Sequence, residues 1–218
     1  MLARRHLLLL ASAALASGCE NNTVKTLRFA YQFGVSGLPD VPITPEQVAA
    51  SPYAMIYAKI GRGPRSVLVL GQKQGDELSW ISADRMAVVT RSGRVTKTAG
   101  LSRNLKGTTF LQPDPLSGGP LNLGGRRAVT RIVDYEDDTG YGAVVEATYT
   151  LEGRQTFAIL GRQHHAEIWR EDNFVKSNGW SFQNHFWIDP DTGFVWKSIQ
   201  HTLREYPPLD IEVLKPAA

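Results

Sequence analysis

Short runs of β-favouring residues recur along this chain between residues 53 and 203, and each run ends in a cluster of glycine, asparagine, aspartate or serine. The runs follow one another at intervals of about 8–12 residues, which is typical of antiparallel sandwiches and barrels. Ser92-Gly93 and Asn178-Gly179 are two-residue hairpin signals, because glycine readily adopts the positive φ that such turns need. The pattern therefore predicts an all-β fold built largely from hairpins.

The runs predict about 11–13 strands in a large antiparallel β-sandwich, half-barrel or barrel, and the sequence does not decide between these. The predicted strands are 27–33, 53–60, 66–72, 77–82, 86–91, 94–98, 126–135, 143–151, 154–163, 166–176, 180–188 and 194–203. Glu152-Gly153 is expected to be the turn between two of them. The prolines at 207–208 are expected to end the fold, with an extended tail after them.

Two segments interrupt the strand pattern. Thr44-Pro45-Glu46-Gln47 has the composition of a helix start, because threonine caps the helix, proline suits its first position and Gln47 completes a capping box. Ser51-Pro52 ends it, so one short helix is expected near 45–50. Residues 106–125 contain five glycines and three prolines. They predict a surface loop between two halves of the domain, with a binding lid as the alternative.

The N-terminus has the organisation of an export signal. Arg4 and Arg5 precede an apolar run, and small residues precede Cys19. The apolar run of about a dozen residues is too short to span a bilayer as a stable helix. The segment Leu15-Ala16-Ser17-Gly18-Cys19 resembles the lipobox of bacterial lipoproteins, in which the cysteine takes a diacylglycerol and the chain is cut in front of it. Cys19 is therefore the predicted lipidation site, and an ordinary cleaved signal is the alternative.

This interpretation divides the chain into a signal peptide at 1–18, a polar tether at 19–26 and a single β domain at 27–218. Cys19 is the one cysteine of the chain, so its lipidation would exclude disulfides, thiol catalysis and cysteine-based metal sites. A body of about 200 residues can bury enough apolar surface to fold without disulfides. Two of the three net positive charges leave with the signal, and nothing in the remainder indicates a nucleic-acid partner.

Four stretches of the chain carry a recognisable pattern: 78–84 (LSWISAD), 89–95 with 98–101 (VTRSGRV and TAGL), 184–189 (NHFWID) and 192–200 (TGFVWKSIQ). In this order behind a lipobox they resemble the YjbF/GfcB family of group 4 capsule polysaccharide lipoproteins, over nearly the whole chain. The resemblance implies a lipoprotein that faces the periplasm, is encoded beside capsule or exopolysaccharide export machinery and has a large antiparallel β structure. It implies no catalytic residues.

The membrane is predicted from Glu20, which follows the cysteine. By resemblance to enterobacterial sorting, aspartate at this position retains lipoproteins at the inner membrane, and most other residues release them outward. We therefore expect the outer membrane, with the protein facing the periplasm. The expected partners are the membrane itself through the lipid, polysaccharide, and outer-membrane export proteins.

Aromatic side chains gather in the last third of the chain. Tryptophan mostly fills cores, and the alternative is a sugar platform on which flat rings stack against pyranose faces. Arginines near the turns could bind acidic sugars through paired hydrogen bonds, and the alternative for them is a solvated turn charge. The candidate ligand-binding residues are Trp180, Trp187, Trp196, Arg91 and Arg94.

The histidines do not predict a metal or catalytic site. His164 and His165 are neighbours on a predicted strand and point to opposite faces, while His165 and Glu167 alone would form a weak site. His185 and His201 are accompanied by no nucleophile elbow and no HExxH motif. We therefore expect no enzyme, no catalytic residue, no metal and no cofactor.

Together these features predict a non-catalytic outer-membrane lipoprotein that assists capsule or exopolysaccharide secretion or assembly by binding the polysaccharide or an export partner. A protein-binding scaffold, a carrier of a lipid or other apolar ligand inside a half-open barrel, and a carbohydrate-active enzyme remain alternatives. An internal apolar cavity of several hundred Å³ would favour the carrier. Two carboxylates facing each other across a cleft would favour the enzyme.

Overall fold

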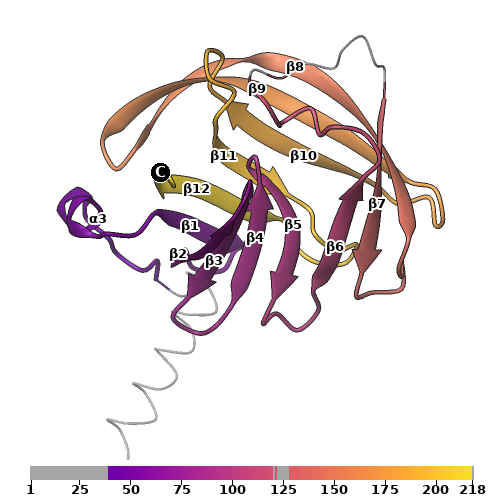
Figure 1. Ribbon diagram of the computed structural model, residues 1–218, viewed down its shortest axis with the longest axis horizontal. Coiled ribbons are helices and arrows are strands. Elements are labelled where there is room, and N and C mark those ends of the chain that lie inside the picture. The colour runs from indigo at the N-terminus through magenta and orange to yellow at the C-terminus, as the bar shows by residue number, and fades with distance from the viewer. Residues whose placement is uncertain (1–38, 120, 122–127, 218) are drawn as a thin grey trace, which may run out of the picture. The chain divides into compact units, whose positions relative to one another are not determined.

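The computed structural model describes residues 39–119, 121 and 128–217. In this part of the chain, twelve antiparallel strands form one sheet that curves into a nearly closed barrel, and one short helix packs against it (Figure 1). The all-β prediction is confirmed, and the barrel replaces the sandwich alternative. The predicted signal, Cys19, the tether and the strand at 27–33 lie outside the described residues.

The sheet order is β5-β4-β3-β2-β1-β12-β11-β10-β9-β8-β7-β6. The elements are α3 (Pro45–Ala50), β1 (Met55–Ile60), β2 (Ser66–Gln74), β3 (Glu77–Ser82), β4 (Ala87–Arg91), β5 (Arg94–Ala99), β6 (Leu105–Phe110), β7 (Val129–Tyr135), β8 (Ala143–Ile159), β9 (Arg162–Val175), β10 (Ser181–Ile188), β11 (Val195–Gln200) and β12 (Leu209–Lys215).

Helix α3 begins and ends where the sequence predicts. Thr44 Oγ1 accepts a hydrogen bond from the backbone N–H of Gln47 at 3.3 Å, and Gln47 Oε1 accepts one from the Thr44 N–H at 2.8 Å. Both halves of the capping box are therefore present, and Ser51 is the C-cap. No helix among the described residues is long and apolar enough to cross a bilayer.

The C-terminal segment does not end the fold at the prolines, so that prediction is wrong. β12 inserts between β1 and β11, where Ile211 faces Ala58 and Val213 faces Ile56. Leu209 and Ile211 are buried and Asp210 between them is more exposed, which is the period of two that a half-buried strand requires. Pro207-Pro208 therefore makes a corner, after which the chain returns to the sheet.

The predicted turn at Glu152-Gly153 is also wrong. β8 runs through it to Ile159, and β9 begins at Arg162. Gly153 sits at a shift in the register of the two strands and has a φ of 149°. Its conformational freedom serves a bulge rather than a turn. Figure 1 shows the resulting β8–β9 hairpin as a long orange ribbon that reaches past the other strands.

The barrel closes where the two end strands of the sheet order, β5 and β6, face each other across a seam. Thr98 Oγ1 on β5 accepts a hydrogen bond from the Leu105 N–H of β6 at 2.9 Å. Gln200 of β11 reaches across the interior, where Oε1 accepts from Val95 N and Nε2 donates to Gly93 O, both at 2.9 Å. These side chains bind backbone groups of β5, of β6 and of the turn before β5 that the ends of an open sheet would otherwise leave unpaired.

Candidate functional site

Charged side chains are buried inside the barrel near the β5–β6 seam. The charged members of this buried ion cluster are Arg94, Asp114, Arg131 and Glu171, which are 2%, 6%, 5% and 0% exposed. Tyr149, Asn173 and Asn184 complete its hydrogen bonds. Two cations and two carboxylates share this space, so their formal charges balance.

Glu171 is the centre of the cluster. Its carboxylate receives Nη1 and Nη2 of Arg94 at 3.0 and 2.9 Å, and Nη1 of Arg131 at 3.1 Å. Tyr149 Oη donates to it at 2.6 Å, and Asn184 Nδ2 donates at 2.8 Å. Both oxygens of the Glu171 carboxylate are therefore held by several donors at once.

Asp114 joins the cluster from the loop after β6. Its two oxygens accept from Nε and Nη2 of Arg94 at 2.6 and 3.2 Å, the bidentate geometry in which arginine binds carboxylates most strongly. Pro115 and Leu116 are buried beside it. The described residues 106–119 of the glycine- and proline-rich segment are thus more ordered than predicted, because they start within β6 and then place Asp114, Pro115 and Leu116 in the interior.

The surroundings of Glu171 and Arg94 favour the charged form of each. Burial by itself raises the pKa of Glu171, but Arg131, Arg94 and the hydrogen bonds outweigh burial and hold that pKa well below its ordinary value. Burial lowers the pKa of Arg94, and the charges of Asp114 and Glu171 more than reverse this effect. Because the Glu171 carboxylate is held as an anion between two arginines, it is suited to holding the barrel together.

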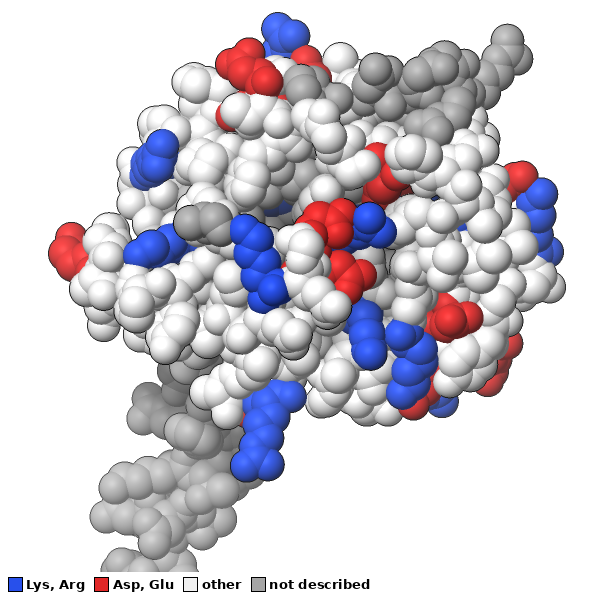
Figure 2. Space-filling view, viewed as in Figure 1, with Lys and Arg blue, Asp and Glu red and all other residues white. Residues whose placement is uncertain are grey.

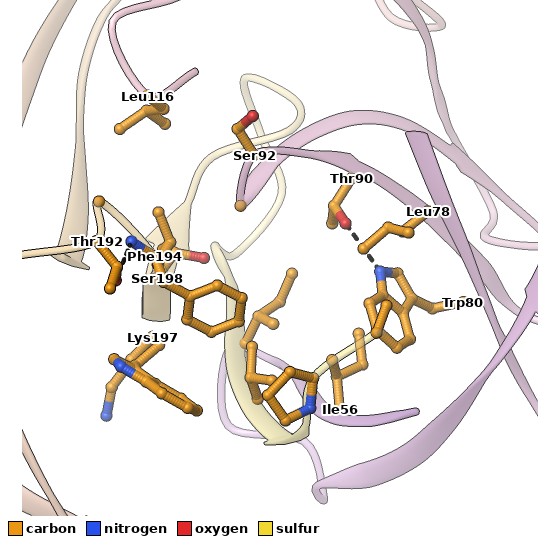
Figure 3. A pocket seen from close by; sticks show the side chains of 18 of the residues that line it. Ile56, Leu78, Trp80, Thr90, Ser92, Leu116, Thr192, Phe194, Lys197 and Ser198 are labelled. Atoms are coloured by element: carbon orange, nitrogen blue, oxygen red, sulfur yellow. Dashed lines mark hydrogen bonds between the residues drawn. The ribbon is translucent and has the colours of Figure 1, made fainter. Parts of the chain in front are cut away.

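A cavity of about 340 Å³ lies inside the barrel, at the end that carries the β4–β5 and β10–β11 turns (Figure 3). Its apolar lining includes Ile56, Trp80, Leu116, Phe194, Trp196 and Val213. Figure 3 shows Trp80 and Phe194 on opposite sides of the space, with Leu116 and Ser92 along its upper edge. The cavity is therefore bounded by strands from both halves of the chain and by the loop that carries Asp114.

Most polar side chains around this cavity are already bonded within the protein. Trp80 Nε1 donates to Thr90 Oγ1 at 2.8 Å, and Gln200 Nε2 donates to Ser198 Oγ at 2.8 Å. Thr192 Oγ1 accepts from the Phe194 N–H at 3.2 Å. Each of these three hydroxyls therefore has one acceptor position occupied within the protein, and the N–H donors of Trp80 and Gln200 are used.

An open groove follows the outer face of β8, β9 and β10. Two rows of paired residues form it: Glu146, Phe174 and Ser181 in one, and Thr148, Asp172 and Gln183 in the other. The Phe174 side chain is 45% exposed, and Gln183 Nε2 donates to Asp172 at 2.8 Å. The groove therefore presents an aromatic ring between carboxylate, hydroxyl and amide groups.

The three predicted tryptophans lie in different places. Trp180 is buried, with its ring 4.2 Å from that of Phe182. Trp187 is half-buried, and its Nε1 donates to Gln155 at 2.8 Å. Trp196 lines the cavity. The structure does not bring them together on one surface, and their role as ligand contacts stays a prediction.

The two predicted arginines are also separated. Arg91 is half-exposed and pairs with Asp76 at 2.5 Å, as a turn charge would. Arg94 is buried in the ion cluster, so it is not a solvated charge. Sequence reasoning missed Arg131 and Glu171, the other charged residues of the cluster that lie on strands. The signal that could have found them is a charged residue at an inward position of an alternating strand. Arg131, for example, lies between the buried Val129 and Val133.

The adjacent histidines lie as strand alternation predicts. His164 is buried, with its ring 4.0 Å from Trp196, while His165 is exposed and bonds to Thr156 Oγ1 at 2.8 Å. Burial lowers the pKa of His164, which favours the neutral ring. Within the described residues, no three His, Cys, Asp or Glu side chains come close enough to hold a metal ion.

Comparison with known proteins gives relatives of matching length. The chain is 29% identical to the uncharacterized lipoprotein GfcB of Escherichia coli K12 over 98% of this chain and 99% of that protein. It is 26% identical to the uncharacterized lipoprotein YjbF of the same organism, over 89% and 91%. The crystal structure of the hypothetical lipoprotein YmcC from E. coli K12 matches with 29% identity and a TM-score of 0.69, covering 91% of this chain and 98% of that one.

The family described as group 4 capsule polysaccharide lipoprotein GfcB, YjbF matches residues 24–214. The match spans most of the chain and includes the described strands β1 to β11 and all of β12 except its last residue. The chain therefore belongs to the YjbF/GfcB family of group 4 capsule polysaccharide lipoproteins, as its four short sequence stretches predict.

Proposed function

We propose that this protein is a non-catalytic accessory of capsule or exopolysaccharide secretion, anchored through a lipid on Cys19 to the periplasmic face of the outer membrane. The observation that carries the proposal is the family match over residues 24–214. The lipobox-like segment supplies the anchor, and Glu20 after the cysteine favours the outer membrane. Figure 2 shows positive and negative side chains intermixed on one face of the protein, a surface suited to partners other than a polyanionic nucleic acid.

The chemistry of the buried carboxylates supports a role without catalysis. A glycosidase needs one carboxyl group that keeps a proton for the leaving group and a second that faces it across the substrate. Glu171 is instead held as an anion by Arg94 and Arg131, and Asp114 is bound by Arg94. These residues stabilise the barrel in the way that structural ion pairs do.

The first experiment removes the lipid. In a host lacking the protein, the wild-type chain is expected to restore surface polysaccharide, whereas Cys19→Ala is expected to lose membrane association and most of the restored polymer. The reason is that stable membrane anchoring requires more than one acyl chain, and all of the chains proposed here are attached through Cys19. Membrane fractionation and polymer quantification measure the two effects. Full secretion by a soluble Cys19→Ala protein would contradict the proposal.

The second experiment tests direct polysaccharide contact at the outer groove. Phe174→Ala is expected to weaken retention of the purified host polysaccharide about three- to tenfold, because aromatic contacts are worth roughly 0.5–1.5 kcal/mol. Leu151→Ala is the matched control, since Leu151 has the same 45% exposure but lies outside the groove. Equal retention by both variants would leave export proteins as the binding partner.

A further inference from the structure

We propose that the 340 Å³ cavity is a binding site for one acyl chain of an amphiphile, whose polar headgroup stays outside the barrel. The proposal goes beyond the accessory role and does not depend on it. It rests on the chemistry of the lining, the size of the space and the way the Asp114 loop closes over it.

The lining favours an alkyl chain over a sugar. The hydroxyl oxygens of Thr90, Ser198 and Thr192 already accept hydrogen bonds from Trp80 Nε1, Gln200 Nε2 and the backbone N–H of Phe194, so part of their capacity is used within the protein. A saccharide would bring several hydroxyl groups into this space, and each hydroxyl without a partner carries a desolvation cost. A chain of methylene groups brings none, and it packs against the aromatic and aliphatic side chains that form most of the wall.

The size of the space favours one chain. Protein interiors contain few spaces larger than a water molecule, so a space of about 340 Å³ inside the barrel is large enough to admit part of a ligand. An apolar ligand in this space would remove the apolar part of its lining from water. The volume lies at the lower end of the range for ligand pockets, which suits a single chain better than a complete diacyl lipid.

The charged residue at the wall directs its charge away from the cavity. Lys197 Nζ donates to Glu212 Oε1 at 3.3 Å and lies 5.3 Å from the centre of the Trp187 ring. Glu212 pairs with Tyr57, on the face of β1 opposite to the buried Ile56, so this ammonium is on the outer face. The interior wall therefore matches the chain of the amphiphile, and its charged or polar headgroup is expected at the mouth.

The Asp114 loop closes one side of the site. Leu116 is 3% exposed and lines the cavity, two residues after the carboxylate that Arg94 holds. Gly118 and Gly119 continue the wall. The buried ion cluster thus fixes the position of Leu116 above the space that the acyl chain would occupy.

A photocross-linking experiment tests the proposal with the full lipoprotein in its host membrane. Cells are fed a fatty acid that carries a diazirine and an alkyne, irradiated, and the purified protein is mapped by mass spectrometry. Adducts are expected on peptides that contain Trp80, Leu116, Phe194 or Val213. The adduct mass distinguishes a free fatty acid, a membrane phospholipid and the acyl group on Cys19 of the same chain, and each of these outcomes supports an acyl-chain site.

Two matched substitutions locate the adducts. Val213→Trp is expected to reduce cavity adducts at least fivefold, because Val213 faces Ile56 on the inward side and the larger ring fills the space. Val67→Trp makes the same change opposite Tyr57 on the outward side and is expected to change nothing. Equal labelling of both variants would overturn the proposal. If the Val213→Trp protein does not accumulate, the adduct positions in the wild-type protein serve as the test. Adducts confined to peptides outside the cavity would then overturn the proposal.

Discussion

Glu171→Gln is expected to lower the free energy of unfolding by about 3–5 kcal/mol, the cost of removing one partner from a buried ion pair. Glutamine keeps the shape of the side chain but removes its charge. Asp114 would then be the remaining carboxylate of the cluster, bound to Arg94, and the buried positive charge of Arg131 would lack compensation. Urea unfolding at neutral pH, followed by tryptophan fluorescence, measures the change.

Glu152→Gln is the matched control. Glu152 Oε1 accepts from Arg170 Nη1 at 2.7 Å, a bond as short as those of Glu171, but its side chain is 32% exposed. Solvent-exposed pairs contribute about 0–1 kcal/mol, so the control is expected to stay near the wild type. Similar costs for the two variants would mean that burial does not set the strength of the cluster.

Adding Arg131→Met to Glu171→Gln is expected to restore part of the unfolding free energy that Glu171→Gln removes. The double variant removes one charge of each sign and leaves Arg94 paired with Asp114. Replacing both partners of a buried pair by groups of similar volume is often neutral, whereas removing one is not. A double variant less stable than Glu171→Gln would indicate that Arg131 acts through its packing and its bond to Asn173.

Glu171 also makes the stability of the barrel depend on pH in the acidic range. The pKa of Glu171 is lowered in the folded protein, so its contribution is complete above the ordinary value near 4.5 and is lost as the pH falls below it. The unfolding free energy of the wild type is expected to fall by about 1.4 kcal/mol per pH unit in that range from this group alone. Glu171→Gln removes that component, and the slope of its profile should be smaller.

Local sequence signals predicted the elements whose geometry is set by a few neighbouring residues. The capping box at Thr44 and Gln47 fixes both hydrogen bonds of the α3 N-terminus within one turn of chain. The turns at Ser92-Gly93 and Asn178-Gly179 lie between consecutive strands as expected. In each case the information needed lies within four residues.

The errors concern elements that depend on distant parts of the chain. Glu152-Gly153 has the composition of a turn, but the long pairing of β8 with β9 carries the strand through it as a bulge. β12 follows two prolines and is stabilised by β1, whose residues lie about 150 positions earlier in the sequence. Local composition does not contain these pairings.

The candidate site residues also fall into those that local sequence predicts and those that depend on distant parts of the chain. Strand alternation correctly predicts that His164 and His165 point to opposite faces of the sheet, because this prediction requires only the two-residue period of a strand. It does not say that Arg94 of β5 meets Glu171 of β9 and Asp114 of a loop, since that meeting depends on the curvature that brings the seam together. The buried ion cluster and the cavity are products of the closed barrel, and they therefore become visible only in three dimensions.

The β4–β5 turn is the local element on which this closure most depends. Gly93 has a φ of 82°, and a Cβ at this position would lie 2.4 Å from Cβ and 2.7 and 2.8 Å from the methyl carbons of Val195. Its carbonyl accepts the Gln200 hydrogen bond that spans the interior. The absence of a side chain therefore allows the turn to pack against β11 and form part of the cavity wall.

Gly93→Ala is expected to lower the free energy of unfolding by about 2–5 kcal/mol, combining roughly 1–2 kcal/mol of left-handed backbone strain with about 1–3 kcal/mol of overpacking. Gly75 provides the comparison, because it lies in the β2–β3 turn with a φ of 61° and a Cβ there would meet nothing within 4 Å among the described residues. Gly75→Ala should therefore cost only the backbone strain, about 1–2 kcal/mol. Urea unfolding of the two variants separates backbone strain from overpacking. Any additional loss of unfolding free energy in Gly93→Ala, relative to Gly75→Ala, measures the contact with Val195. An equal loss of unfolding free energy in both variants would show that β11 shifts to accommodate the added methyl group. Closure of the barrel would then not require the close approach of Gly93 to Val195.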